Sequence, residues 1–133
     1  MDISKYTAFF HDGSLLDVKH QGNTIVLSMS SAEINKDDLQ ENIHLPKNKR
    51  IQGKLHIEKI KSININQQPF KDEFKMTYDD AEIAHFELKE GYVELEIFWT
   101  NYPPKDKVND FNIIEIEAEK IWWETIPNLE SFS

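Results

Sequence analysis

Apolar and polar residues alternate most regularly over residues 79–99 of the 133-residue chain. The apolar positions in the second half of this segment are Val93, Leu95, Ile97 and Trp99. Glu94 and Glu96 lie between them, and a period of two is typical of a strand with one buried face and one solvated face. Glu90 and Gly91 supply a tight turn, because glycine adopts the positive φ that such turns require. The pattern predicts a β-hairpin.

A second hairpin is predicted near the N-terminus. Residues 14–20 and 24–30 alternate in a similar way, and Gly22 lies in the turn between them. In the first of these strands we expect Leu16 and Val18 to face the interior. The residues before the hairpin add three aromatic core anchors, namely Tyr6, Phe9 and Phe10.

A single long strand is predicted after each hairpin. Residues 51–65 depart from strict alternation, so we expect a β-bulge near residues 58–61. Residues 112–118 alternate cleanly, and the strand continues from there, directly or after a bulge. The continuation contains Trp122 and Trp123, and neighbouring side chains on a strand point to opposite faces. One tryptophan therefore belongs in the core and the other outside, and the pattern does not decide which.

The two hairpin–loop–strand units resemble each other at a spacing of about 68 residues. In this alignment Leu15 falls on Ile83, Val18 on Phe86 and Leu27 on Leu95. The resemblance predicts two repeat halves, about 7–66 and 75–127, within a single domain of residues 1–133, although any two amphipathic hairpins look alike. The expected fold is all-β, an antiparallel two-layer sandwich or partly open barrel. It contains at most one short helix, at residues 36–42 with Asn35 as N-cap.

Composition and charge narrow the class of protein. A hydrophobic content of 39% with 11% aromatic residues is too high for a disordered chain. Cysteine is absent, no apolar run approaches the roughly 20 residues of a membrane helix, and no signal peptide is visible. We therefore expect a cytoplasmic protein. The net charge of -9 argues against nucleic acid and anionic membranes as partners.

Negative charge is concentrated in the second half of the chain. Residues 1–66 contain nine Lys/Arg and eight Asp/Glu, whereas residues 67–133 contain six lysines and sixteen Asp/Glu. A carboxylate ladder with period two faces outward on the predicted strands and comprises Glu94, Glu96, Glu115, Glu117 and Glu119. It is either an ordinary solvated face, relieved by lysines such as Lys59 or Lys120 on a neighbouring strand, or a surface for a basic protein partner. In the second interpretation the aromatic anchors are Trp99, Tyr102, Trp122 and Trp123.

His11-Asp12 is the pair that most suggests chemistry. A histidine beside an aspartate can ligate a metal or transfer protons. An aspartate in a turn ordinarily caps that turn, however, so we expect Asp12 to do so and His11 to bond to the backbone. The sequence therefore assigns no catalytic residue and no cofactor.

The other four histidines are scattered singly, without a His-x-x-x-His spacing or a cysteine. We expect His85 to share one side of its strand with Ile83 and Glu87. A metal site that combines His11 and His85 with Asp79 or Asp80 is a minor alternative, because unguided clusters seldom have ligand geometry. No metal ligand is assigned.

Two short motifs carry a resemblance. Phe10-His11-Asp12-Gly13 precedes the first hairpin, and Gly53-Lys54-Leu55 lies at the start of the long strand. In these motifs the chain resembles small bacterial β proteins of similar length, most of them uncharacterised and some described as immunity proteins of polymorphic toxin systems. The resemblance implies a bacterial cytosolic β domain and carries over no site residue.

Three functions are compatible with these patterns. The first is a non-enzymatic protein-interaction domain, such as an acidic immunity-type inhibitor that binds a basic protein. The second is a carrier of a small apolar ligand inside a β-barrel. The third is a metal-dependent enzyme at His11 and Asp12. Both a monomer and a homodimer joined through an exposed edge strand are compatible with the pattern.

Overall fold

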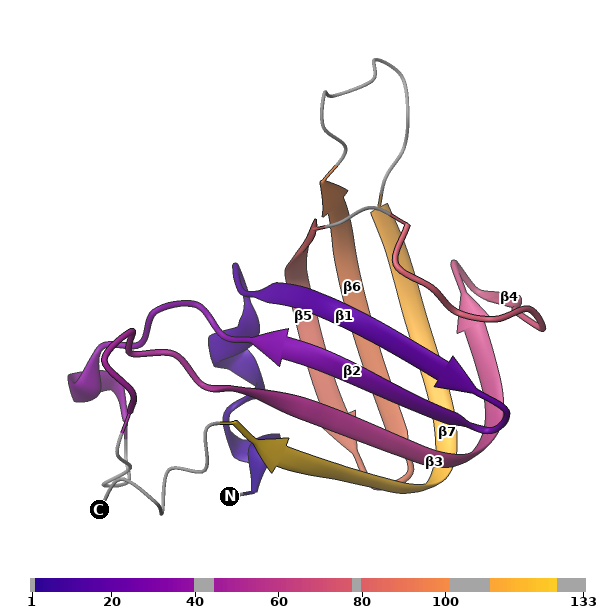
Figure 1. Cartoon of the computed structure of the whole chain (residues 1–133), viewed down its shortest axis with the longest axis horizontal. Coiled ribbons are helices and arrows are strands. Elements are labelled where there is room, and N and C mark those ends of the chain that lie inside the picture. The colour runs from indigo at the N-terminus through magenta and orange to yellow at the C-terminus, as the bar shows by residue number, and fades with distance from the viewer. Residues whose placement is uncertain (1, 40–44, 78–79, 101–110, 127–133) are drawn as a thin grey trace.

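The chain folds as antiparallel β-strands (Figure 1). The computed structural model describes residues 2–39, 45–77, 80–100 and 111–126. Its strands are β1 (Ser14–Gln21), β2 (Thr24–Ser30), β3 (Gln52–Ile65), β4 (Gln68–Pro69), β5 (Asp80–Lys89), β6 (Tyr92–Thr100) and β7 (Phe111–Thr125). The helical segments of these ranges are three 3₁₀ turns, η1 (Ile3–Lys5), η2 (Thr7–Phe10) and η3 (Lys36–Asp38). Both predicted hairpins and both long strands are confirmed.

One sheet contains all seven strands in the order β2-β1-β5-β6-β7-β3-β4, and a further pairing of β2 with β3 closes six of them into a ring. The ring is incomplete between β1 and β5, where Ser14 pairs with Glu82 and Leu15 with Ala81. The segment after β4 is hydrogen-bonded to the C-terminal end of β1, because the backbone N–H of Phe74 donates to His20 Nδ1 at 2.8 Å. The predicted fold class, an all-β sandwich or partly open barrel, is confirmed.

The long strands β3 and β7 each take part in both layers of the barrel. Residues 52–57 of β3 pair with β2, and residues 111–117 of β7 pair with β6, while β3 and β7 pair with each other over most of their length. β7 bends as it passes from one layer to the other, as Figure 1 shows. At the same level β3 shifts register between Ile60 and Ser62, and Lys59 adopts a φ of 54°. The bulge predicted near residues 58–61 is confirmed.

The two hairpins share an irregularity at equivalent positions. β1 shifts register between Leu15 and Asp17, and β5 shifts register between Ile83 and His85. The extra residue of a bulge reverses the facing of the side chains that follow it. Leu16 is the unpaired residue of the bulge in β1 and is 43% exposed, while Leu15 before it is buried, so the prediction that Leu16 faces the interior was wrong. For the same reason Ile83 and His85 do not share a side, because Ile83 is buried and His85 is exposed.

The short helical turns place the N-terminal aromatic residues in the core. Tyr6 and Phe10 are buried and Phe9 packs against them from a half-buried position, as predicted. η3 lies inside the range predicted to be helical, and Asn35 caps it, since its Oδ1 accepts from the N–H of Asp37 at 3.1 Å. Residues 40–42 of that range lie outside the described residues. No helix in the described ranges has the length and apolar character that crossing a bilayer requires.

Side chains from every long strand fill the interior. The inward positions predicted for β6 are at most 5% exposed: Val93, Leu95, Ile97 and Trp99. Phe10 has no exposed surface, and its ring meets those of Phe86 and Trp123 edge-on at centroid distances of 5.2 and 5.8 Å. Trp123 is thus the tryptophan that packs against the core, and Trp122 is the one outside. The alternation on which the fold prediction rested is confirmed.

Candidate functional site

The outer surface of β5, β6 and β7 carries carboxylates from the second hairpin and from the long strand that follows it. We name it the acidic face and define it by five residues, Glu87, Glu94, Glu96, Glu115 and Glu117. They point outward, because side chains alternate along a strand and the neighbouring Phe86, Leu95 and Ile116 are buried. Strand pairing brings them together, since β6 lies between β5 and β7 in the sheet (Figure 1).

Three of these carboxylates form one row across the sheet. Glu87 of β5 is directly opposite Glu94 of β6, and Glu94 is directly opposite Glu115 of β7. Side chains directly opposite on antiparallel strands have Cβ atoms roughly 5 Å apart, so like charges in this arrangement destabilise the sheet. The row is therefore a local cost in stability within an otherwise well-packed fold.

Two neighbouring side chains lie close to the row. His85 Nε2 is 3.7 Å from Glu87 Oε2 and 3.4 Å from Glu94 Oε2. The hydroxyl of Tyr92 donates to Glu115 Oε2 at 3.0 Å and, less closely, to Glu94 Oε1 at 3.5 Å. Burial of the hydroxyl, its hydrogen bond to Glu115 and the surrounding carboxylates raise the pKa of Tyr92 above its ordinary range. His85 and Tyr92 thus both contact the carboxylate row, and the raised pKa favours the neutral form of Tyr92.

Lysine neutralises only the margins of this surface. Glu87 pairs with Lys89 at 3.3 Å, and Glu119, at the bend of β7, pairs with Lys59 at 3.8 Å. Among the residues that the structure describes, no Lys or Arg lies within ion-pair distance of the other four members of the acidic face. Relief by neighbouring lysines, the first interpretation of the ladder, thus applies to Glu119 and not to the centre of the face.

An aromatic pair lies at the end of the acidic face. Phe98 of β6 is 51% exposed, and its ring lies 4.7 Å from that of Phe111, the residue directly opposite on β7. The sequence argument did not single out either phenylalanine. Strict alternation would have identified Phe98, because it lies two residues after Glu96 and therefore points to the same side of the strand as Glu94 and Glu96.

The structure does not place the predicted aromatic anchors on the acidic face. Trp99 is 5% exposed and its indole N–H donates to Asn112 Oδ1 at 2.6 Å, inside the barrel. Trp123 packs against the core, because its strand turns that side inward. Trp122 is exposed, but it lies where β7 pairs with the first half of β3, away from β6. Tyr102 lies outside the described residues.

Trp122 belongs to a separate surface group on β3 and β7. Its ring stacks on His56 at a centroid distance of 3.9 Å and an interplanar angle of 5°. Its indole N–H donates to Glu58, and His56 Nε2 lies 2.9 Å from Glu124 Oε1. These contacts place Trp122 in a group separate from the acidic face.

The His11-Asp12 bend has a structural role. His11 Nδ1 lies 2.6 Å from the carbonyl oxygen of Ala84, the bulged residue of β5, so His11 bonds to the backbone as predicted. Asp12 adopts a φ of 67°, and its N–H donates to the carbonyl of Ile83 at 2.9 Å. The bend therefore fixes the start of β1 beside β5, where the ring of strands closes.

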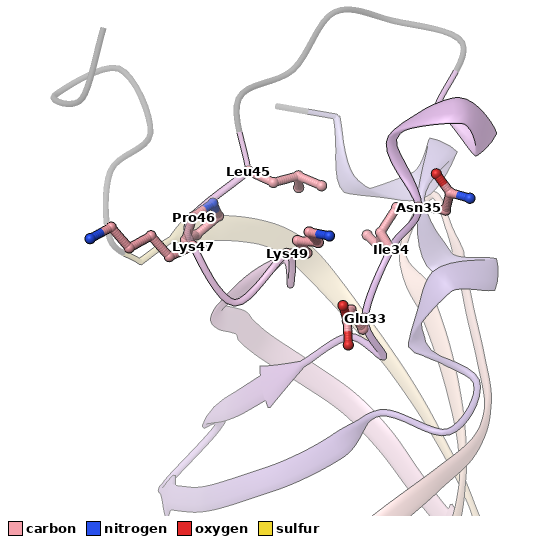
Figure 2. A pocket seen from close by; sticks show the side chains of 7 residues that line it. All are labelled: Glu33, Ile34, Asn35, Leu45, Pro46, Lys47 and Lys49. Carbon is pink, nitrogen blue, oxygen red and sulfur yellow. The ribbon is translucent and has the colours of Figure 1, made fainter.

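A pocket of about 750 Å³ opens between the loops that follow β2 and precede β3 (Figure 2). Its lining includes Glu33, Ile34, Leu45, Lys47 and Lys49. It lies among loop residues rather than among the inward side chains of the strands. It therefore gives no direct support to a ligand held inside the barrel, and the carrier function stays a prediction.

Removing the Tyr92 hydroxyl tests the environment of the carboxylate row. A group whose pKa is higher in the folded chain than in the unfolded chain stabilises the fold below its unfolded pKa, and this contribution is lost as the pH rises above it. The ordinary tyrosine value is 10.0, so we expect the free energy of unfolding to fall above pH 10 in the wild type and to fall less in Tyr92→Phe. Urea titrations at neutral pH and above pH 10 measure this difference. Parallel declines in the two proteins would show that Tyr92 does not sense the carboxylates.

The acidic face, with its row of three carboxylates and the neighbouring pair of an exposed Phe98 and a half-buried Phe111, is the surface that these contacts single out. Four of its five carboxylates were predicted from the sequence, whereas Glu87, Tyr92 and the two phenylalanines emerge from strand pairing. Comparison of the chain with known proteins found no matching family model, no matching curated protein and no matching solved structure.

Proposed function

We propose that the protein is a non-enzymatic interaction domain that binds a basic protein through the acidic face. The observation that carries this proposal is the row Glu87–Glu94–Glu115, in which like charges stand directly opposite one another on three neighbouring strands. A row of this kind costs stability in the free protein. A partner with complementary positive charge would offset that cost and would be steered to the surface from a distance.

The aromatic pair supplies the apolar part of such an interface. Phe98 and Phe111 lie on the same outer surface as the carboxylates, two positions along their strands from Glu96 and Ile113. Protein interfaces combine buried aromatic anchors with a polar rim, and aromatic side chains dominate the energy when they are desolvated. The face therefore offers both long-range attraction and a local anchor.

An immunity-type inhibitor of a bacterial toxin, acting in the cytoplasm, is the specific form that we favour. The Phe10-to-Gly13 and Gly53-to-Leu55 motifs support it through their resemblance to such proteins. An inhibitor must capture its target quickly, and an acidic surface raises the association rate with a basic enzyme. A homodimer joined through an edge strand stays a separate prediction. Such a dimer would use the edge of β5 beyond Ile83, because β1 pairs only with the start of β5.

Charge reversal on the acidic face is expected to abolish partner binding. The wild type and a Glu94→Lys/Glu115→Lys variant would be immobilised in parallel and exposed to a lysate, and the retained proteins identified by mass spectrometry. We expect a basic protein to be retained by the wild type and lost from the variant. Its association rate, measured by surface plasmon resonance with the purified pair, should fall by roughly tenfold or more as the salt concentration rises, because salt screens the steering.

The matched control carries the same change in net charge at another site. Asp37→Lys/Asp38→Lys alters two exposed carboxylates of η3, which does not pair with the sheet, and should leave retention unchanged. Glu94→Gln/Glu115→Gln serves as the folding control, since it removes the like-charge row and should be at least as stable as the wild type. Retention by both Lys variants alike, or an association rate that ignores salt, would refute the proposal.

A further inference from the structure

A cluster of three side chains, those of His85, Glu87 and Glu94, lies on the outer surface of the second hairpin. One ligand atom from each residue lies within 4.8 Å of the others. His85 and Glu87 are two residues apart on β5 and face the same way, and Glu94 lies directly opposite Glu87 on β6. The three side chains therefore project from two paired strands, which hold them more firmly than a loop would.

The separations fit a small divalent ion. A zinc ion binds imidazole nitrogen and carboxylate oxygen at about 2.0–2.2 Å, so tetrahedral ligands lie roughly 3.4 Å apart. His85 Nε2 is 3.4 Å from Glu94 Oε2 and 3.7 Å from Glu87 Oε2. Small side-chain rotations would bring all three atoms to bonding distance around one centre.

The second oxygen of each carboxylate lies near a different donor. Glu94 turns Oε2 toward His85 while its Oε1 is 3.5 Å from the hydroxyl of Tyr92. Glu87 turns Oε2 toward His85 while its Oε1 is 3.3 Å from Lys89 Nζ. Such outer partners orient metal-ligating carboxylates and leave one oxygen of each directed at the ion.

We propose that His85, Glu87 and Glu94 bind a divalent transition-metal ion, with Zn²⁺ as the best fit. An imidazole with two carboxylates favours Zn²⁺ over Mg²⁺ or Ca²⁺, which prefer all-oxygen sites. Three protein ligands leave a fourth position for water. The bound ion offsets the charges of Glu87 and Glu94, two of the three carboxylates in the row, and cross-links β5 to β6. This inference rests on the ligand geometry and does not depend on the proposed function.

Titration of the untagged, chelator-treated chain with ZnCl₂ by isothermal calorimetry tests the proposal. We expect one equivalent of Zn²⁺ to bind and to raise the melting temperature. His85→Ala and Glu94→Gln should each lower the affinity by at least about tenfold, and Tyr92→Phe should lower it to a smaller extent, because it removes an outer partner. Excess Mg²⁺ should not displace the ion.

His56→Ala is the matched control. His56, like His85, lies beside a carboxylate, that of Glu124, but it has no second carboxylate at ligand distance within the described part of the chain. Its removal should leave the one-equivalent binding unchanged. Equal affinity of His85→Ala and the wild type, displacement by Mg²⁺, or the absence of saturable binding would each overturn the proposal. Glu94→Gln removes a ligand and a like charge together, so it keeps the test valid if His85→Ala folds poorly.

Discussion

Replacing Phe10 with alanine is expected to lower the free energy of unfolding by about 3–5 kcal/mol, the range for deletion of a fully buried phenylalanine side chain. The ring has no exposed surface, and it meets the rings of Phe86 and Trp123 edge-on. It comes from η2, outside the sheet, and contacts one aromatic side chain of β5 and one of β7. Its loss therefore leaves a cavity that rigid strands cannot close.

Urea denaturation followed by tryptophan fluorescence measures the change. Phe98→Ala removes the same number of atoms from a ring that is 51% exposed, and it should cost well under half as much. The environment of Trp123 should also change in Phe10→Ala, because the two rings are in contact. Similar losses of stability in the two variants would contradict the complete burial of Phe10.

Gly53→Ala is the second substitution with a large expected effect, about 3 kcal/mol, at the upper end of the cost of overpacking a core. A Cβ at this position would lie 2.2 Å from the carbonyl oxygen of Glu124 and 2.7 Å from the ring of Trp123. Gly53 pairs with Thr125 of β7 on one side and with Met29 of β2 on the other, so no strand can shift here without breaking strand pairing. The strands must therefore separate where β3 begins.

Gly22→Ala is the control for Gly53→Ala. Gly22 has a φ of +58° and open space around its Cα, so its cost is conformational, about 1–2 kcal/mol. Thermal and urea unfolding of both variants would separate the two kinds of cost. If Gly53→Ala is no less stable than Gly22→Ala, the close approach of β3 to β7 is not as tight as described.

The fold was predictable from the sequence where alternation is unbroken. Val93, Leu95, Ile97 and Trp99 point inward as expected, since a strand with one wet face leaves little choice of register. Leu16 was misplaced because a bulge in β1 reverses the facing, and an apolar residue gives no sign of such a bulge. The bulge in β3 was predictable, because there the apolar spacing itself is broken.

The candidate site was predictable in part. The period of two identified Glu94, Glu96, Glu115 and Glu117 as outward residues, but it could not show that Glu94 lies opposite both Glu87 and Glu115. Strand order and register decide such neighbours, and both depend on contacts between distant segments. The cluster around His85 was hidden for the same reason, because the bulge after Ile83 moves the imidazole to the outer surface.

The continuous path of β3 and β7 through both layers has a consequence for the architecture. Each predicted half contributes one long strand, and these two strands pair with each other from Gly53 to Ile65 of β3, so each occupies an edge that the other half would otherwise leave open. A fragment containing one half alone would expose the unpaired edge of its long strand to solvent. The two halves are thus obligate complements, and any ancestor built from a single unit would have had to pair with a second copy of itself.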